Sequence, residues 1–320
     1  MADTHGAADA DARASRAVTT LTDDDPRAPA RRRRHGPLPW LAPGVLLLAL
    51  LSAVPVLLLG CISLTSFEIG YAWADREFAG ASNYQRLFSG REAQFWPALR
   101  LSLLVTVVSV ALKLALGLSV AVVLNRRPRL EYLATALLIM PMAVNPAIAG
   151  LMWKLMLSFD FGIVNAALAS IAGTKVVWLG QSYALVSVVL VLVWMHFPLS
   201  ALLLLGGLRA IPREPLEAAR LDGCSESQAF WRIVMPQLAP VVLSSSLLQA
   251  ILAFQSFGPI FTLTDGGPGN ATTILPLYIY KTAFGLGEIG LAAAAAVVLV
   301  VVTMSLSAAM LALRRRDLPA

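Results

Sequence analysis

The chain has 320 residues, of which 58% are hydrophobic and only 14% are charged. A soluble domain is usually about 45–50% apolar and about 25% charged, so this composition excludes an ordinary water-facing surface. The formal net charge of +6 could suggest nucleic acid. The basic residues instead flank long apolar segments, so we expect no nucleic-acid partner. The two cysteines, Cys61 and Cys224, lie far apart in the chain, and neither a disulfide nor a metal site is expected.

The first 39 residues are rich in Ala, Asp and Arg and show no apolar periodicity. We interpret residues 1–39 as a disordered cytosolic tail, which either stays solvated and sets topology or touches anionic lipid. The following apolar segment, 40–63, is too long for the core of a signal peptide, and no cleavage site stands out after it. It is therefore predicted to be an uncleaved first transmembrane helix.

Six segments have the length and composition of membrane spans. A hydrocarbon core about 30 Å thick requires roughly 20 apolar residues in a helix. In chain order the segments are 41–63, 96–124, 132–157, 181–208, 238–261 and 289–313. Because backbone amides in lipid must be paired within their own segment, each is predicted to be helical. The expected fold class is an all-α polytopic membrane protein with about six transmembrane helices, of which Pro141 and Pro146 kink the third.

The basic residues set the expected orientation. Most of the 25 Lys and Arg side chains fall in the tail, in the links 125–131 and 209–232, and in the C-terminal segment 314–320. Basic residues collect on the cytosolic side of membrane proteins. Both termini are therefore predicted to lie in the cytosol.

The cytosolic link 208–236 contains residues that favour the starts and ends of two helices. Its signals are Pro212 and Pro215 for a first turn, Gly223 for a C-terminal turn, Ser225 and Gln228 for a capping box, and Pro236 for an end. We therefore expect a short helix, a glycine turn and a second amphipathic helix. The small Ala218 and Ala219 would let another surface approach closely, which suits a socket on a partner protein. The alternative is a hairpin packed against its own spans.

The fifth span is the most polar. Ser245, Gln249 and Ser256 would lie within about 40° of each other on a continuous helix. This stripe is our candidate solute path, because such side chains could line a water-filled pathway. The alternative is hydrogen bonding between helices, which is common for Ser and Gln in membranes.

One string in the link resembles a known family pattern. Glu217, Ala218, Ala219, Asp222 and Gly223, followed by Phe230, Ile233, Pro236 and Pro240, are similar to the EAA loop of permease subunits in binding-protein-dependent ABC importers. Cys224 and Met235 replace the Ala and Leu that are usual there, and both substitutions keep the residues apolar and similar in size. Further stretches resemble the carbohydrate branch: Asn83-Tyr84, Met140-Pro141, Trp153, Trp194, Phe197-Pro198 and Thr264 to Asn270.

The resemblance implies a type I ABC importer permease fold over 95–313, with the EAA loop at 210–240, in the cytoplasmic (inner) membrane. It implies a second permease subunit, two ATPase subunits, an extracytoplasmic solute-binding protein and membrane lipid as partners. Glu217, Ala218, Ala219, Asp222 and Gly223 would couple to the ATPase. The chain itself would hold no catalytic residues, cofactor or metal, because it lacks a phosphate-binding G-x-x-x-x-G-K-[ST] loop and ATP would be used by the partner.

Three rival functions differ in what the sequence should contain. An ion-driven secondary transporter usually carries acidic residues near the membrane midplane, and none lies well inside the six segments. A membrane protein that only anchors partners would leave the helix start and end signals in 208–236 unexplained. A permease of the same family could import glycerol phosphate, a polyamine or an amino acid instead of a sugar.

Overall fold

The computed structural model describes residues 38–72, 76–127, 129 and 131–316. Outside this part of the chain lie residues 1–37 of the predicted tail, 1–39, and residues 317–320 of the segment 314–320. The chain divides into the residues up to Val54 and a compact unit, Pro55–Ala320. The described residues of the first unit form the N-terminal part of helix α2 (Leu38–Ser63).

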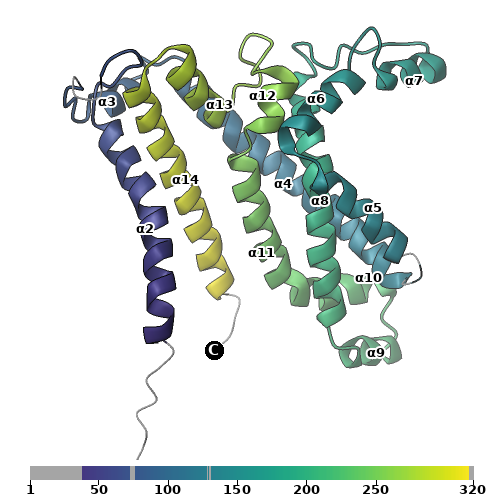
Figure 1. Cartoon of the computed structure of the whole chain (residues 1–320). Coiled ribbons are helices and arrows are strands. Elements are labelled where there is room, and N and C mark those ends of the chain that lie inside the picture. Colours follow the sequence, from purple (N-terminus) through teal and green to yellow (C-terminus); the bar gives the residue numbers. More distant parts are fainter. Residues whose placement is uncertain (1–37, 73–75, 128, 130, 317–320) are drawn as a thin grey trace, which may run out of the picture. The chain divides into compact units, whose positions relative to one another are not determined.

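The described residues are helical, as the composition predicts (Figure 1). Five helices or helix runs are long and apolar enough to cross a membrane, and a sixth span results if one bent pair is counted. The single helices are α2, α4 (Phe95–Arg126), α8 (Ala184–Ala210) and α14 (Ile289–Arg316), and α10, η3 and α11 together form the run Glu226–Phe254. The bent pair is α5 (Glu131–Ala143) and α6 (Pro146–Met156).

The predicted kink in the third span is confirmed as a break of 98° between α5 and α6. Pro141 lies inside α5, where it removes a backbone donor from the last turns. Asn145 then caps α6 by accepting a hydrogen bond from the Ala147 amide, 3.0 Å away. Pro146 occupies the first turn of α6, where a missing N–H leaves no bond unmade. The two prolines therefore end one helix and begin the next.

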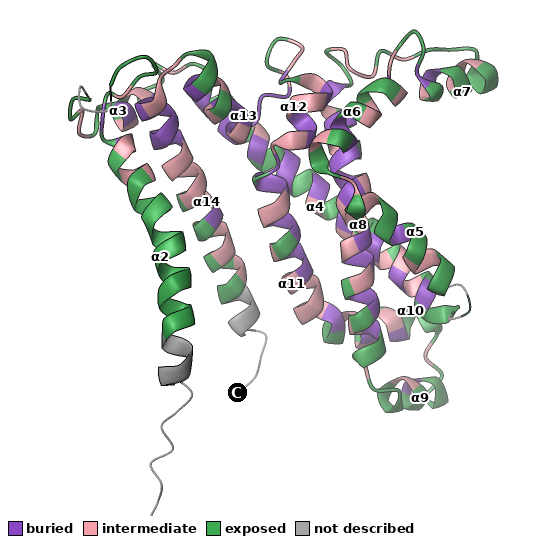
Figure 2. Ribbon diagram, viewed as in Figure 1, coloured by how far each residue is buried: buried purple, intermediate pink, exposed green. Residues whose placement is uncertain are grey.

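The core of the Pro55–Ala320 unit lies between α4, α8 and α11 (Met235–Phe254). The small residue Gly117 allows α4 to approach α8 closely, because a Cβ added there would lie 2.7 Å from the Cβ of Ser200. Large apolar side chains such as Val107 and Met304 point outward and are mostly exposed. Figure 2 shows the same division along α4, α8, α11 and α14, with buried and exposed residues on the same helices. Outward apolar side chains of this kind suit contact with lipid.

Ion pairs and hydrogen bonds connect the segment after α2 to the start of α14. Arg86 in α3 (Ser82–Phe88) lies 2.8 Å from the Glu92 carboxylate and 2.7 Å from that of Glu288. Burial opposes the charge on Arg86. The hydrogen bond to Glu92 and the two carboxylate charges outweigh it, so the pKa of the guanidinium is raised above its usual value. Asn83 adds hydrogen bonds to the backbone carbonyls of Ser63 and Thr65.

The segments that connect these spans form further short helices. They are α7 (Ile163–Ala172), α9 (Glu214–Leu221), α12 (Gly258–Thr264), α13 (Leu275–Tyr280) and the π-helix η4 (Lys281–Gly285). Helix α12 packs against α6, and the Thr262 hydroxyl donates to the Ala147 carbonyl oxygen, 2.8 Å away.

Candidate coupling surface and solute path

The predicted short helix of the 208–236 link is α9, and it ends in the predicted glycine turn. Gly223 has φ of 80°, a left-handed conformation that residues with a Cβ rarely adopt. The Cys224 amide donates to the Ala219 carbonyl at 2.9 Å, and the Gly223 amide donates to the Arg220 carbonyl at 3.1 Å. This pair of bonds is a Schellman motif, which satisfies carbonyls left free at the helix end.

The capping box that starts the second helix is also confirmed. The Ser225 amide donates to Gln228 Oε1 at 3.0 Å, and the Gln228 amide donates to Ser225 Oγ at 3.3 Å. These bonds begin α10 (Glu226–Ala229). The prediction that Pro236 ends this helix is wrong. A π-helical turn, η3 (Phe230–Val234), widens the hydrogen-bond ladder ahead of the proline, and the helix runs on into α11.

The two parts of the link have different environments. Val234 and Leu238 are buried among Leu204, Leu205 and Leu208 of α8, so η3 and the start of α11 pack against the chain's own spans. Helix α9 is mostly exposed (Figure 2). Helix α9 is therefore the part of the link that suits a socket on a partner protein. The segment η3 instead fits the alternative, a hairpin packed against its own spans.

The residues expected to couple to an ATPase are divided between two faces of α9. Glu217 and Ala218 are exposed, as are Asp222 and Gly223 in the turn. Ala219 is only 8% exposed and packs toward its own chain, so Ala218 is the small residue of this pair that lies on the exposed side. The sequence interpretation overlooked Leu221, an apolar side chain that is 90% exposed. Its position one helical turn after Glu217 was the available signal.

Two of the three candidate solute-path residues join α11 to α8. Gln249 Nε2 donates to the His196 carbonyl and to Ser200 Oγ, each 2.9 Å away. Ser245 Oγ lies 3.5 Å from the same serine oxygen. Ser245, Gln249 and Ser200 are fully buried within the chain. In this conformation they form hydrogen bonds between α8 and α11. Such bonds between helices were the alternative to a solute path.

Ser256 does not lie on the predicted helical stripe. Helix α11 ends at Phe254, and Gln255 is its C-terminal cap. Gly258 and Pro259 then start a separate helix, α12, because proline favours the first turn of a helix. The predicted span 238–261 is therefore two helices, and Ser256 lies in the short link between them.

A buried cation lies close to this polar cluster. Lys113 in α4 is fully buried, so it faces the bundle. In the part of the chain that the structure describes, neither Lys113 Nζ nor Gln249 Oε1 has a hydrogen-bond partner. Lys113 lies one turn from Gly117, which packs on Ser200. The α4–α8–α11 contact therefore contains polar atoms with free bonding capacity.

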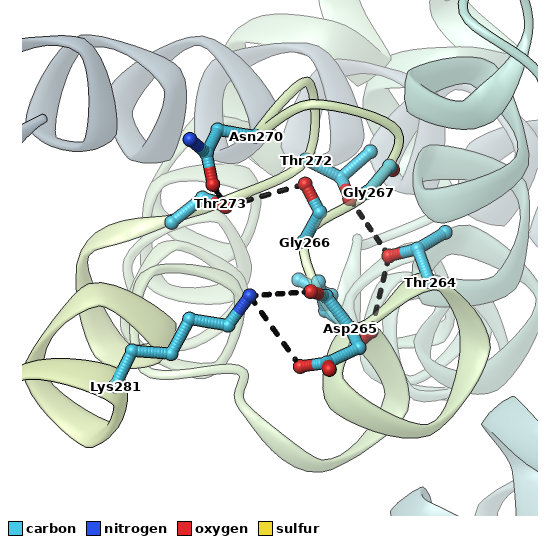
Figure 3. A network of polar contacts seen from close by, with 9 residues as sticks. Thr264, Asp265, Gly266, Gly267, Asn270, Thr272, Thr273 and Lys281 are labelled. Atoms are coloured by element: carbon cyan, nitrogen blue, oxygen red, sulfur yellow. Dashed lines mark hydrogen bonds and ion pairs between the residues drawn. The ribbon is translucent and has the colours of Figure 1, made fainter. Parts of the chain in front are cut away.

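The glycine-rich segment after α12 forms a compact turn (Figure 3). Asp265 and Asn270 have positive φ values of 48° and 75°. Lys281 Nζ lies 2.6 Å from the Asp265 carbonyl oxygen and 3.6 Å from its carboxylate. Thr264 and Thr272 share a hydrogen bond of 2.7 Å across the turn. Lys281 is thus the partner that holds the turn.

Together, an apolar multi-helix bundle and an exposed helix with the EAA string define a membrane transport subunit. Comparison with known proteins agrees. Residues 113–317 match the family model described as "Binding-protein-dependent transport system inner membrane component". The chain belongs to this family of ABC transporter permeases.

Several relatives are similar along most of their length. A probable ABC transporter permease of Sinorhizobium fredii is 34% identical over 88% of this chain and 91% of its own. The trehalose/maltose transport system permease of Thermococcus litoralis is 37% identical, over 68% of this chain and 74% of its own. The sulfoquinovosyl glycerol transport system permease of Agrobacterium fabrum is 30% identical over 86% and 89%.

The fold is that of an ABC importer permease. A bacterial ABC transporter that imports the polysaccharide alginate superposes with a TM-score of 0.72 at 19% identity, over 87% of this chain and 94% of that one. A methionine ABC transporter gives a TM-score of 0.53 at 20% identity. The expected all-α fold and the membership of the importer permease family are therefore confirmed.

Proposed function

We propose that this permease passes a sugar or sugar derivative across the cytoplasmic membrane. The support comes from two relatives whose matches cover more than 65% of this chain. Their names specify transport of trehalose/maltose and of sulfoquinovosyl glycerol. The same family with glycerol phosphate, a polyamine or an amino acid as solute is the second candidate. An ion-driven mechanism is less favoured, because α4, α8, α11 and α14 contain no Asp or Glu.

The energy for transport comes from ATP hydrolysed in two separate ATPase subunits. The observation that carries this part is the exposure of Glu217, Ala218 and Leu221 on a short helix whose end is fixed by Gly223. A rigid helix with a small residue between an acidic and an apolar side chain suits a groove in a partner. Movement of that groove would be passed to α11, because η3 continues into it without a break.

Ser245, Gln249 and Ser256 remain our candidates for the solute path. Ser245 and Gln249 are closed between α8 and α11 in this conformation, so they would meet solute when those helices separate. Gln249 Oε1 is without a partner in the described part of the chain, which leaves an acceptor for a sugar hydroxyl. Alternating access of this kind also requires a second, similar permease facing this one.

The remaining partners follow from the same proposal. A solute-binding protein delivers the sugar at the face that carries the Asp265–Asn270 turn, and both termini of the permease lie in the cytosol. The basic links 125–131 and 209–232 support this orientation.

Reconstitution tests the proposed solute class. The permease, its second permease, its ATPase and its binding protein are placed in vesicles, and ATPase activity is measured with sugars, amino acids, polyamines and glycerol phosphate. We expect stimulation by one sugar class and uptake that survives a protonophore. Stimulation by a non-sugar alone would contradict the solute, and uptake that needs an ion gradient would contradict the mechanism.

A further inference from the structure

A groove behind α9 is lined by both charged and apolar side chains. A cavity of about 250 Å³ lies between the ends of α4 and α8, helix α9 and the α10–η3 segment. A second cavity, of about 500 Å³, continues along α4. The two share Val122, Arg126, Glu226 and Phe230, so they adjoin each other. We refer to both together as the α4–α9 groove.

The polar end of the groove carries two guanidinium groups and one carboxylate. Arg126 Nη2 lies 3.0 Å from Glu226 Oε2, and the two side chains are 64% and 69% exposed. Exposed ion pairs of this kind are weak, because water screens them. Arg220 of α9 and Asn125 also line this end. A phosphate could therefore bind Arg126 and Arg220 without breaking a strong internal pair.

The part of the groove that continues along α4 follows a membrane-spanning helix. Its apolar lining is Leu118, Val122 and Phe230, and Ser119 and Ser227 line it beside the Arg126–Glu226 pair. Leu118 is eight residues before Arg126, which corresponds to about 12 Å along α4. The groove thus leads from arginines at the end of a span into the depth where acyl chains lie. A soluble anion would use only the polar end.

We propose that the α4–α9 groove binds one anionic phospholipid, with its phosphate at Arg126 and Arg220 and an acyl chain over Leu118 and Val122. Basic pockets between helices at the cytoplasmic end of membrane proteins bind anionic headgroups by the same chemistry. Leu216 and Arg220 bring α9 itself to the lipid, and neither Glu217 nor Leu221 lines the groove. The bound lipid supports the helix from behind and holds it in place for a partner.

Native mass spectrometry of the purified full-length chain tests this proposal, with phosphatidylglycerol, phosphatidylcholine and inorganic phosphate as probes. Phosphatidylglycerol should bind with one saturable site, and phosphatidylcholine and phosphate should not compete for it. Arg126→Gln with Arg220→Gln should weaken phosphatidylglycerol about 10- to 30-fold. The matched control is Arg213→Gln with Arg232→Gln, which removes the same charge from exposed positions outside the groove and should leave that site unchanged.

A variant with the opposite effect guards against a folding artefact. Glu226→Gln releases Arg126 and removes the only carboxylate that lines the described groove, so it should tighten phosphatidylglycerol binding. Equal losses in the groove and control pairs would overturn the proposal in favour of diffuse surface attraction. Binding of inorganic phosphate as tight as that of the lipid would overturn it in favour of a soluble anion. Weaker binding by Glu226→Gln would overturn the assigned role of Arg126.

Discussion

The side-chain nitrogen of Gln249 in α11 donates a hydrogen bond to the hydroxyl of Ser200 in α8, 2.9 Å away in the buried centre of the bundle. The same nitrogen reaches the His196 carbonyl. These two bonds connect the span that continues the coupling link to the span that precedes the link. A displacement of η3 and α11 must therefore act on this contact.

Replacing Gln249 should destabilise the bundle. Gln249→Leu leaves the His196 carbonyl and the Ser200 hydroxyl without their donor, and we expect a loss of about 1 kcal/mol, the upper range for such bonds in membranes. Thermal unfolding in detergent is the measurement, with Ser244→Ala as the control, because Ser244 bonds only to Pro240 of its own helix. An unchanged unfolding temperature combined with lost uptake would show that Gln249 contacts solute and does not hold the helices.

Gly117→Ala should separate α4 from α8. The added Cβ would lie 2.7 Å from Ser200 Cβ and 2.9 Å from the Ala201 amide nitrogen, and overpacking of this kind costs about 1–3 kcal/mol. Gly206→Ala is the matched control, because no atom lies within 4 Å of the Cβ that it adds. Thermal stability should fall for the first variant and hold or rise slightly for the second. Equal stability of both would contradict the close approach.

The turn at Gly223 should tolerate residues according to their backbone preferences. No atom lies near an added Cβ at this glycine, so Gly223→Ala and Gly223→Val suffer backbone strain of about 1–2 kcal/mol and no clash. Gly223→Asn should be milder, because Asn adopts the left-handed conformation more readily. ATPase binding by the solubilised permease should follow the order Gly, Asn, Ala, Val, with membrane insertion unchanged. A Val variant that binds normally would show that the turn geometry is not needed.

Two engineered cysteines test the orientation. In a background with Cys61 and Cys224 replaced by Ala, a cysteine at Ser82 should react with an impermeant thiol reagent in intact cells. A cysteine at Ser225 should react only after the membrane is opened. Both positions are exposed in the structure, so access depends only on the side of the membrane. The reverse pattern of labelling would invert the topology.

The features that the sequence predicted correctly are local ones. The Gly223 turn and the Ser225–Gln228 capping box depend on residues within one helical turn of each other, and their spacing determines the bonds. The position of the third-span break follows in the same way from Pro141 and Pro146. Apolar length likewise predicted the spans, because lipid imposes a minimum helix length.

The errors arose where the structure depends on neighbours. Pro236 was expected to end a helix, but a π-turn accommodates it because Val234 and Leu238 are held against α8. Ser256 was placed on a helical stripe, yet α11 ends at Phe254 and a separate helix, α12, starts at Gly258. Ser200, the partner of Gln249, is 49 residues away, so no spacing rule could identify it. The burial of Ala219 likewise depends on how α9 packs, which the sequence of the helix does not show.

The central claim is that the exposed face of α9 docks on an ATPase subunit. The most direct test is pull-down of the ATPase by solubilised permease that carries Glu217→Lys and Leu221→Asp. Both residues are exposed, so the changes should not disturb the fold, and a like-charge or desolvated-charge mismatch across an interface can cost several kcal/mol. Asp160→Lys, at an exposed acidic residue between α6 and α7, is the control for charge reversal. We predict that the double variant inserts normally but loses the ATPase, whereas the control retains it. Retention of the ATPase by both proteins would contradict the assignment of α9 as the coupling helix.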